Sequence, residues 1–91
     1  MCTMIAQQVK VSGSGKAGSG WFKVDTASVS YDHPYNLALE YALNLDFTNS
    51  AGDPSARVAV ELDWASAQKL LETIQQVMRQ ADAGGFGMGG S

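Results

Sequence analysis

The segment LALEYALNLDF, Leu37–Phe47, decides the fold expected for this chain of 91 residues. Its even positions hold alanine or polar residues, and its odd positions are all large and apolar: Leu37, Leu39, Tyr41, Leu43, Leu45 and Phe47. Successive side chains of a β-strand point to opposite faces of the sheet, so this alternation predicts a strand with one buried face. A helix could not gather these side chains on one stripe, because it repeats about every 3.6 residues.

Three further segments have strand patterns. Met4–Val11 and Trp21–Tyr31 precede the first segment, with a bulge or short turn expected at Asp25. Arg57–Asp63 follows it, with alternating Val, Val and Leu on one parity. The turn-forming residues of Asn49–Ser55 separate the last two strands, which predicts an antiparallel hairpin.

The period changes after Asp63, which is a suitable helix N-cap. Apolar residues then recur at spacings of three and four, typical of an amphipathic helix, and Gly84 and Gly85 end the pattern. The apolar positions of this stripe are Ala67, Leu70, Leu71, Ile74, Val77, Met78 and Ala81. We therefore expect an α+β fold, an antiparallel sheet of about four strands covered on one face by a single C-terminal helix.

The chain divides into a single domain over residues 1–83 and a glycine-rich tail over residues 84–91. Ordering the tail costs about 1–2 kcal/mol of backbone entropy per residue. Its apolar side chains, Phe86 and Met88, return about 1.5–3 kcal/mol each when fully buried. Because that does not offset the cost, we expect the tail to be ordered only against a neighbouring chain or partner.

Charge and composition exclude several classes of function. The net charge is −3, and the six Lys and Arg residues are scattered rather than clustered, which argues against nucleic-acid binding. No apolar run approaches the roughly 20 residues of a membrane span. The N-terminus lacks a signal-peptide pattern, and the single cysteine cannot form an internal disulfide, so a cytoplasmic location is expected.

The segment Ser12–Gly20, SGSGKAGSG, fits the spacing G-x-G-x-x-G of nucleotide-binding loops. Those motifs need a helix directly after the loop, because the helix N-terminus binds phosphate. Here the strand-like residues Trp21–Val24 follow. We therefore interpret Ser12–Gly20 as a flexible connection, and we expect no cofactor.

Cys2, Asp32 and His33 are the candidate residues for a ligand or metal site. His33 is the single histidine, and Asp32 beside it could orient its imidazole ring. A metal site needs three or four ligands, and no spacing rule supports one here. The alternative is that Asp32 and His33 satisfy backbone groups of the turn before Leu37, and that Cys2 is idle.

Large apolar and aromatic side chains are candidates for a protein interface, because such residues anchor interfaces more often than they bind cofactors. These candidates are Trp21, Tyr35, Trp64, Phe86 and Met88.

The chain also resembles a family of small bacterial proteins, found mainly in actinobacteria and catalogued as a domain of unknown function. The resemblance runs over roughly Met1–Met78 and leaves out the tail; its motifs are MCTMIA (Met1–Ala6), SGSGK, GWF-x-V (Gly20–Val24), YDHP (Tyr31–Pro34) and RVAVELD (Arg57–Asp63). It implies no activity, cofactor or catalytic residue.

Together these patterns favour a non-catalytic protein over an enzyme, one that acts through its surfaces as a homo-oligomer or as an accessory subunit of a larger assembly. A small-molecule or metal-binding module, or a minor enzyme, that uses Cys2, Asp32 and His33 is the alternative.

Overall fold

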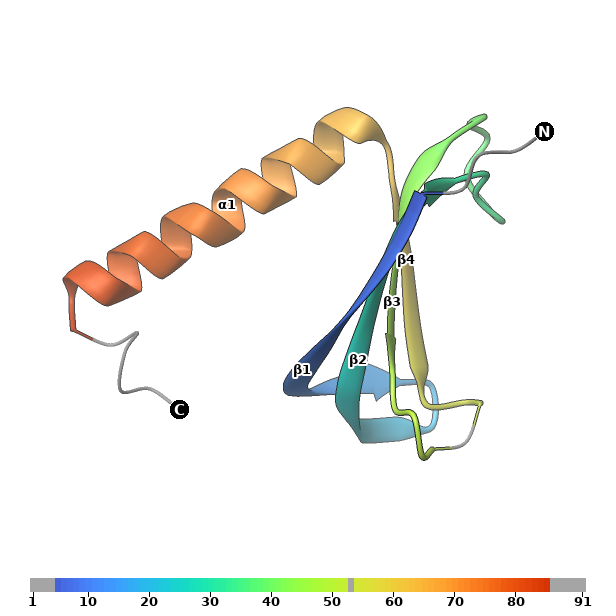
Figure 1. Cartoon of the computed structure of the whole chain (residues 1–91), viewed down its shortest axis with the longest axis horizontal. Coiled ribbons are helices and arrows are strands. Elements are labelled where there is room, and N and C mark those ends of the chain that lie inside the picture. The colour runs from blue at the N-terminus through green and yellow to red at the C-terminus, as the bar shows by residue number, and fades with distance from the viewer. Residues whose placement is uncertain (1–4, 53, 86–91) are drawn as a thin grey trace.

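A computed structural model describes residues 5–52 and 54–85 of the chain. Four antiparallel strands form one sheet in the order β1-β2-β3-β4, and a C-terminal helix follows (Figure 1). The elements are β1 (Ile5–Ala17), β2 (Gly20–Asp32), β3 (Ala42–Thr48), β4 (Arg57–Leu62) and α1 (Trp64–Ala83). The predicted α+β class, the antiparallel sheet and the single C-terminal helix are confirmed.

The first two strands are longer than the sequence predicted, and the interpretation of Ser12–Gly20 as a flexible connection is wrong. β1 continues to Ala17, which pairs with Gly20 across a two-residue turn. Gly20 has a φ of 126°, a conformation open to glycine and rare for other residues. Small side chains weaken the periodic signal of this segment, although its backbone pairs as a strand.

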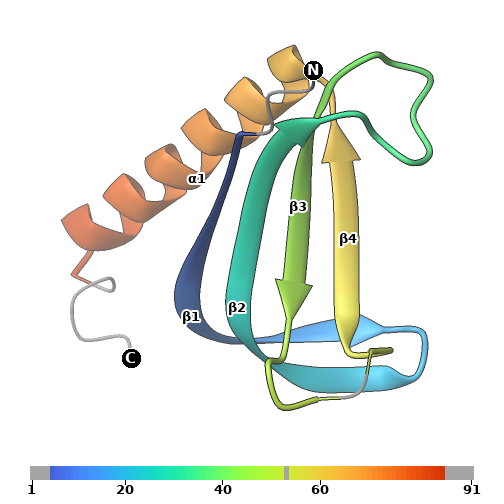
Figure 2. The same ribbon diagram turned by 45° about the vertical axis from the view of Figure 1, so that its right-hand side comes forward.

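A bulge bends the β1–β2 hairpin. The pairing shifts between Lys10 and Gly13 of β1, opposite Asp25 of β2, where the sequence indicated a bulge. Beyond it, the end of the hairpin swings across the foot of the sheet toward β4 (Figure 2). β1 and β4 therefore come into contact, although they lie at opposite edges of the sheet.

The prediction of a strand from Leu37 to Phe47 is half right. β3 begins at Ala42, which pairs with Asp32, the last residue of β2. Residues 33–41 form a loop instead. No described strand pairs with residues 37–41. The carboxylate of Glu61 instead binds the N–H groups of Tyr35, Asn36 and Leu37, so these donors are satisfied without a ladder.

The alternation within β3 and β4 is confirmed by their register. Val29 of β2, Leu45 of β3 and Val60 of β4 are paired across the sheet on one face. The opposite face is polar, with Asn44 paired to both Ser30 and Glu61. Each face of the sheet thus has the chemistry expected from the sequence.

The helix α1 begins where expected. The carboxylate of Asp63 accepts a hydrogen bond of 2.7 Å from the backbone N–H of Ser66, and Gly84 ends the helix. α1 contacts β3 but then diverges from the sheet, so its two ends lie at very different distances from the strands (Figure 1). Its apolar stripe remains exposed, and no helix residue is buried.

Among residues 5–52 and 54–85, the buried apolar residues are small or medium in size: Val24, Ala27 and Ala42. No large side chain in those ranges is fully enclosed. Nor does any helix there combine the length and hydropathy needed to span a bilayer.

Candidate functional site

Asp32 and His33 lie at the end of β2, where the chain enters the loop of residues 33–41. The Asp32 carboxylate accepts a 2.7 Å hydrogen bond from the backbone N–H of His33. The His33 Nδ1 atom lies 2.6 Å from the carbonyl oxygen of Glu40, and its ring stacks on Tyr41 with centroids 4.8 Å apart. The His33 side chain therefore links the two ends of the loop, whereas the Asp32 carboxylate binds the backbone of its neighbour in the chain.

The third predicted member of the site, Cys2, lies outside the residues that the structure describes, as do the interface candidates Phe86 and Met88. In the described part of the chain, no three His, Cys, Asp or Glu side chains gather in a way that could hold a metal ion. A pairing of Cys2 with His33 stays a prediction.

The stacked rings continue from the loop to the helix. Tyr41 also stacks on Tyr31, with ring centroids 5.8 Å apart, and Tyr31 meets the edge of Trp64 at 5.5 Å. Edge-to-face and offset contacts at these distances are favourable for aromatic rings. The row His33–Tyr41–Tyr31–Trp64 thus joins the loop, β2 and the first residue of α1.

Glu61 is the main structural residue that the sequence analysis missed. Its Oε2 atom accepts a 2.7 Å bond from the N–H of Tyr35, and its Oε1 atom accepts 3.0 Å bonds from the N–H groups of Asn36 and Leu37. The hydrogen bond from the Leu37 N–H has the largest effect on the pKa of Glu61. Together with those from Tyr35 and Asn36, it holds that pKa below its usual range. Its outward parity on β4 was visible in the sequence, but its distant partners were not.

The polar face of the sheet carries a shallow hollow of about 270 Å³. Asp32 and His33 both line it, as does an ion pair in which the Arg57 Nε–H donates to Asp46 Oδ1 at 2.7 Å. The hydrogen bond to Asp46 raises the pKa of Arg57 above its usual value. The charged groups of this hollow are engaged with each other or with backbone.

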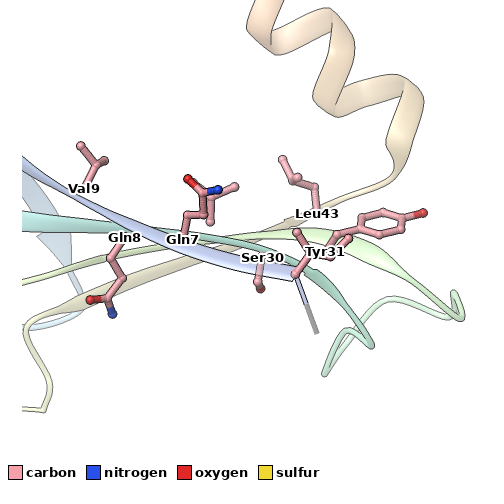
Figure 3. A pocket seen from close by; sticks show the side chains of 8 residues that line it. Gln7, Gln8, Val9, Ser30, Tyr31 and Leu43 are labelled. Atoms are coloured by element: carbon pink, nitrogen blue, oxygen red, sulfur yellow. The ribbon is translucent and has the colours of Figure 1, made fainter. Parts of the chain in front are cut away.

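The opposite face carries apolar hollows, two of which share Val29 and Leu43. One, of about 460 Å³, lies between the sheet and α1 and is lined by Trp64, Leu70 and Ile74 among others. The other, of about 400 Å³, lies over β1 and β2. Figure 3 shows Gln7, Val9 and Leu43 on the side of the sheet that faces the helix, whereas Gln8 and Ser30 point the other way.

The remaining interface candidates are exposed. Trp64 lines the apolar hollow beside α1 and is still 60% exposed. Trp21, near the tip of the bent hairpin, is 71% exposed, and Tyr35 in the loop is 97% exposed. Trp64 therefore lines the hollow beside α1, and Trp21 lines a further hollow of about 440 Å³ with Phe47 and Val58. Tyr35 lies at the hollow of the polar face.

Comparison with protein families gives a match over nearly the whole chain. The model of a family of unknown function (DUF6295) matches residues 1–87, and so extends past Met78 into the glycine-rich segment. No curated protein and no solved structure matches the chain.

Proposed function

The chain belongs to this family of unknown function (DUF6295), and we propose that it is a non-catalytic protein that acts by self-association. The observation that carries the proposal is the exposed apolar surface formed by α1 and one face of the sheet.

A domain of this size is stable only if it buries most of its apolar side chains. Here the apolar stripe of α1 and much of the facing sheet remain exposed, including Val77 and Val9 at 57% and 56%. Isolated exposed apolar residues are ordinary, but a contiguous face of them indicates an interaction site.

The shape supports the same proposal. The radius of gyration is 15.1 Å. A compact domain of this length has about 12 Å. The difference arises because α1 extends away from the sheet rather than lying flat on it (Figure 1). A second molecule would complete the burial that the single chain lacks.

The test is the oligomeric state of the full chain, measured by light scattering coupled to size exclusion over a range of concentrations. We expect a dimer or larger oligomer, with a melting temperature that rises with protein concentration. Replacing Ile74 and Val77 together by Gln removes apolar surface from α1 and should shift the oligomer toward monomer. Glu72→Gln, on the polar side of the same helix, is the matched control.

A monomer at every concentration, with a melting temperature independent of concentration, would contradict self-association. If that monomer is recovered only in a stoichiometric complex with another protein, the role of accessory subunit replaces it. The alternative of a ligand site at Asp32 and His33 has less support, because both side chains bind the backbone of their own loop.

A further inference from the structure

The two hollows that share Val29 and Leu43 form one apolar groove, and no residue of α1 lines its part over β1 and β2. The helix residues that line its two hollows end at Ile74. Val77 and Met78, one turn further along α1, are 57% and 65% exposed. Within residues 5–52 and 54–85, the groove over Val9 and Val29 and the second half of the helix stripe are therefore both left exposed.

The contacts of α1 with the sheet that the structure shows lie near the start of the helix. A single residue, Asp63, separates β4 from α1, and its carboxylate caps the helix. The Trp64 ring meets Tyr31 edge-on at 5.5 Å, which adds a second restraint on the first turn. Both contacts lie at the first turn of α1, and the rest of the helix diverges from the sheet and leaves an open wedge beside it (Figure 1).

We propose that a second copy of this chain fills the wedge, with the Ile74–Met78 segment of its α1 lying over β1 and β2 of the first copy. This arrangement rests on the proposed self-association and specifies its contacts. By two-fold symmetry the first copy inserts its own α1 into the second, so each copy contributes one groove and one helix stripe.

The size of the uncovered surface fits one standard interface. Nine large apolar side chains on this face are more than a third exposed: Ile5, Val9, Val29, Trp64, Leu70, Leu71, Ile74, Val77 and Met78. Full burial of such a side chain removes roughly 60–120 Å² of apolar surface, so complete coverage of these nine half-exposed groups removes roughly 300–500 Å² per copy, about the apolar share of a standard interface. A standard interface buries about 800 Å² per partner.

The charges also allow a second copy. Lys69 and Arg79 balance Glu72 and Asp82, so α1 carries no net charge. Two such helices can therefore approach without the repulsion that the acidic chain as a whole would suggest. At about 1.5 Å per residue, the 20 residues of α1 span about 30 Å.

Crosslinking between differently labelled copies tests this arrangement. In the full chain with Cys2→Ser, one preparation carries Val9→Cys and a second, labelled with ¹⁵N, carries Val77→Cys. The two are mixed, allowed to exchange subunits and treated with a short bismaleimide. Mass spectrometry should find several-fold more mixed dimer than in the control, where Gln8→Cys replaces Val9→Cys and points to the opposite face.

Two results would overturn the arrangement while leaving self-association intact. One is a dimeric protein whose Val9→Cys mixture crosslinks no more than the Gln8→Cys control. The other is a chain carrying both Val9→Cys and Val77→Cys that crosslinks only within itself at a concentration where the protein is dimeric. A monomeric parent protein would overturn both proposals.

Discussion

At the scale of single residues, three carboxylates hold two loops of this chain and the start of its helix. Asp25 accepts hydrogen bonds from the Ser50 hydroxyl at 2.8 Å and the Thr26 hydroxyl at 2.8 Å. Asp63 accepts the first-turn N–H of Ser66. Glu61 accepts those of the loop before β3. Each carboxylate accepts hydrogen bonds from N–H or O–H groups that have no partner in a helix or a strand ladder.

Glu61→Gln should loosen the loop of residues 33–41. A carboxylate offers two acceptor atoms, whereas the amide of Gln keeps one and turns N–H donors toward the N–H groups of the loop. We expect the amide hydrogens of Tyr35 and Leu37 to exchange about tenfold faster in the variant, since charge-assisted bonds to both are weakened.

Glu40→Gln is the control for this measurement, because its carboxylate lies in the same loop and takes no part in those bonds, while its carbonyl oxygen still meets His33. Equal exchange rates in the Glu61→Gln variant and the parent protein would show that the loop does not depend on this carboxylate.

At the scale of elements, the bent end of the β1–β2 hairpin depends on a close approach at Gly15. A Cβ atom at this position would lie 3.1 Å from Val24 Cγ2 and 3.4 Å from Phe22 Cζ. Val24 is one of the few buried apolar residues, so the absence of a side chain at Gly15 lets the curled hairpin pack closely.

Gly15→Ala should therefore destabilise the protein, whereas Gly13→Ala should not. At Gly13 a Cβ atom meets nothing within 4 Å. Overpacking costs typically about 1–3 kcal/mol. Gly→Ala at an unstrained position stabilises by about 0.4–1 kcal/mol. Thermal unfolding at a fixed protein concentration should place the melting temperature of Gly15→Ala at least about 4–8 °C below that of Gly13→Ala.

Two equal melting temperatures would mean that Val24 and Phe22 yield to the added methyl group at no cost. The close approach would then not determine the bend of the hairpin.

At the scale of the whole molecule, the same three carboxylates predict how stability depends on pH. Hydrogen bonds lower the pKa of Asp25, Glu61 and Asp63 in the folded chain. Groups with lowered pKa values stabilise the folded state above their unfolded pKa, about 3.9 for Asp and 4.3 for Glu. That contribution is lost as the pH falls through the lower folded values.

The urea midpoint should accordingly stay level from pH 7 to about pH 5 and fall below it. A triple variant, Asp25→Asn, Glu61→Gln and Asp63→Asn, should have a lower urea midpoint at pH 7. Its midpoint should also fall less than that of the parent protein on acidification. Protein concentration must be the same throughout, because association also contributes to the midpoint. Parallel pH profiles for the two proteins would show that these three groups do not cause the acid sensitivity.

The sequence by itself determined the elements whose signals are local. Alternation over Leu43–Phe47 and Arg57–Leu62 fixed which face of β3 and β4 is apolar, because neighbouring side chains of a strand point to opposite sides. The helix and its limits followed from the spacing of the apolar residues and from Asp63 and Gly84, which act on adjacent backbone groups. The candidate pair Asp32 and His33 was correctly placed at a turn.

Tertiary structure alone decided the features that depend on distant partners. Alternation continues back to Leu37, yet the strand begins at Ala42, because β2 stops pairing at Asp32 and Glu61 supplies acceptors from another strand. The glycine-rich segment of β1 becomes a strand because β2 pairs with it. The apolar stripe of α1 predicted a helix over the sheet, but α1 contacts the sheet near its start and then diverges from it (Figure 1). An angle between two elements is not encoded in the period of either one.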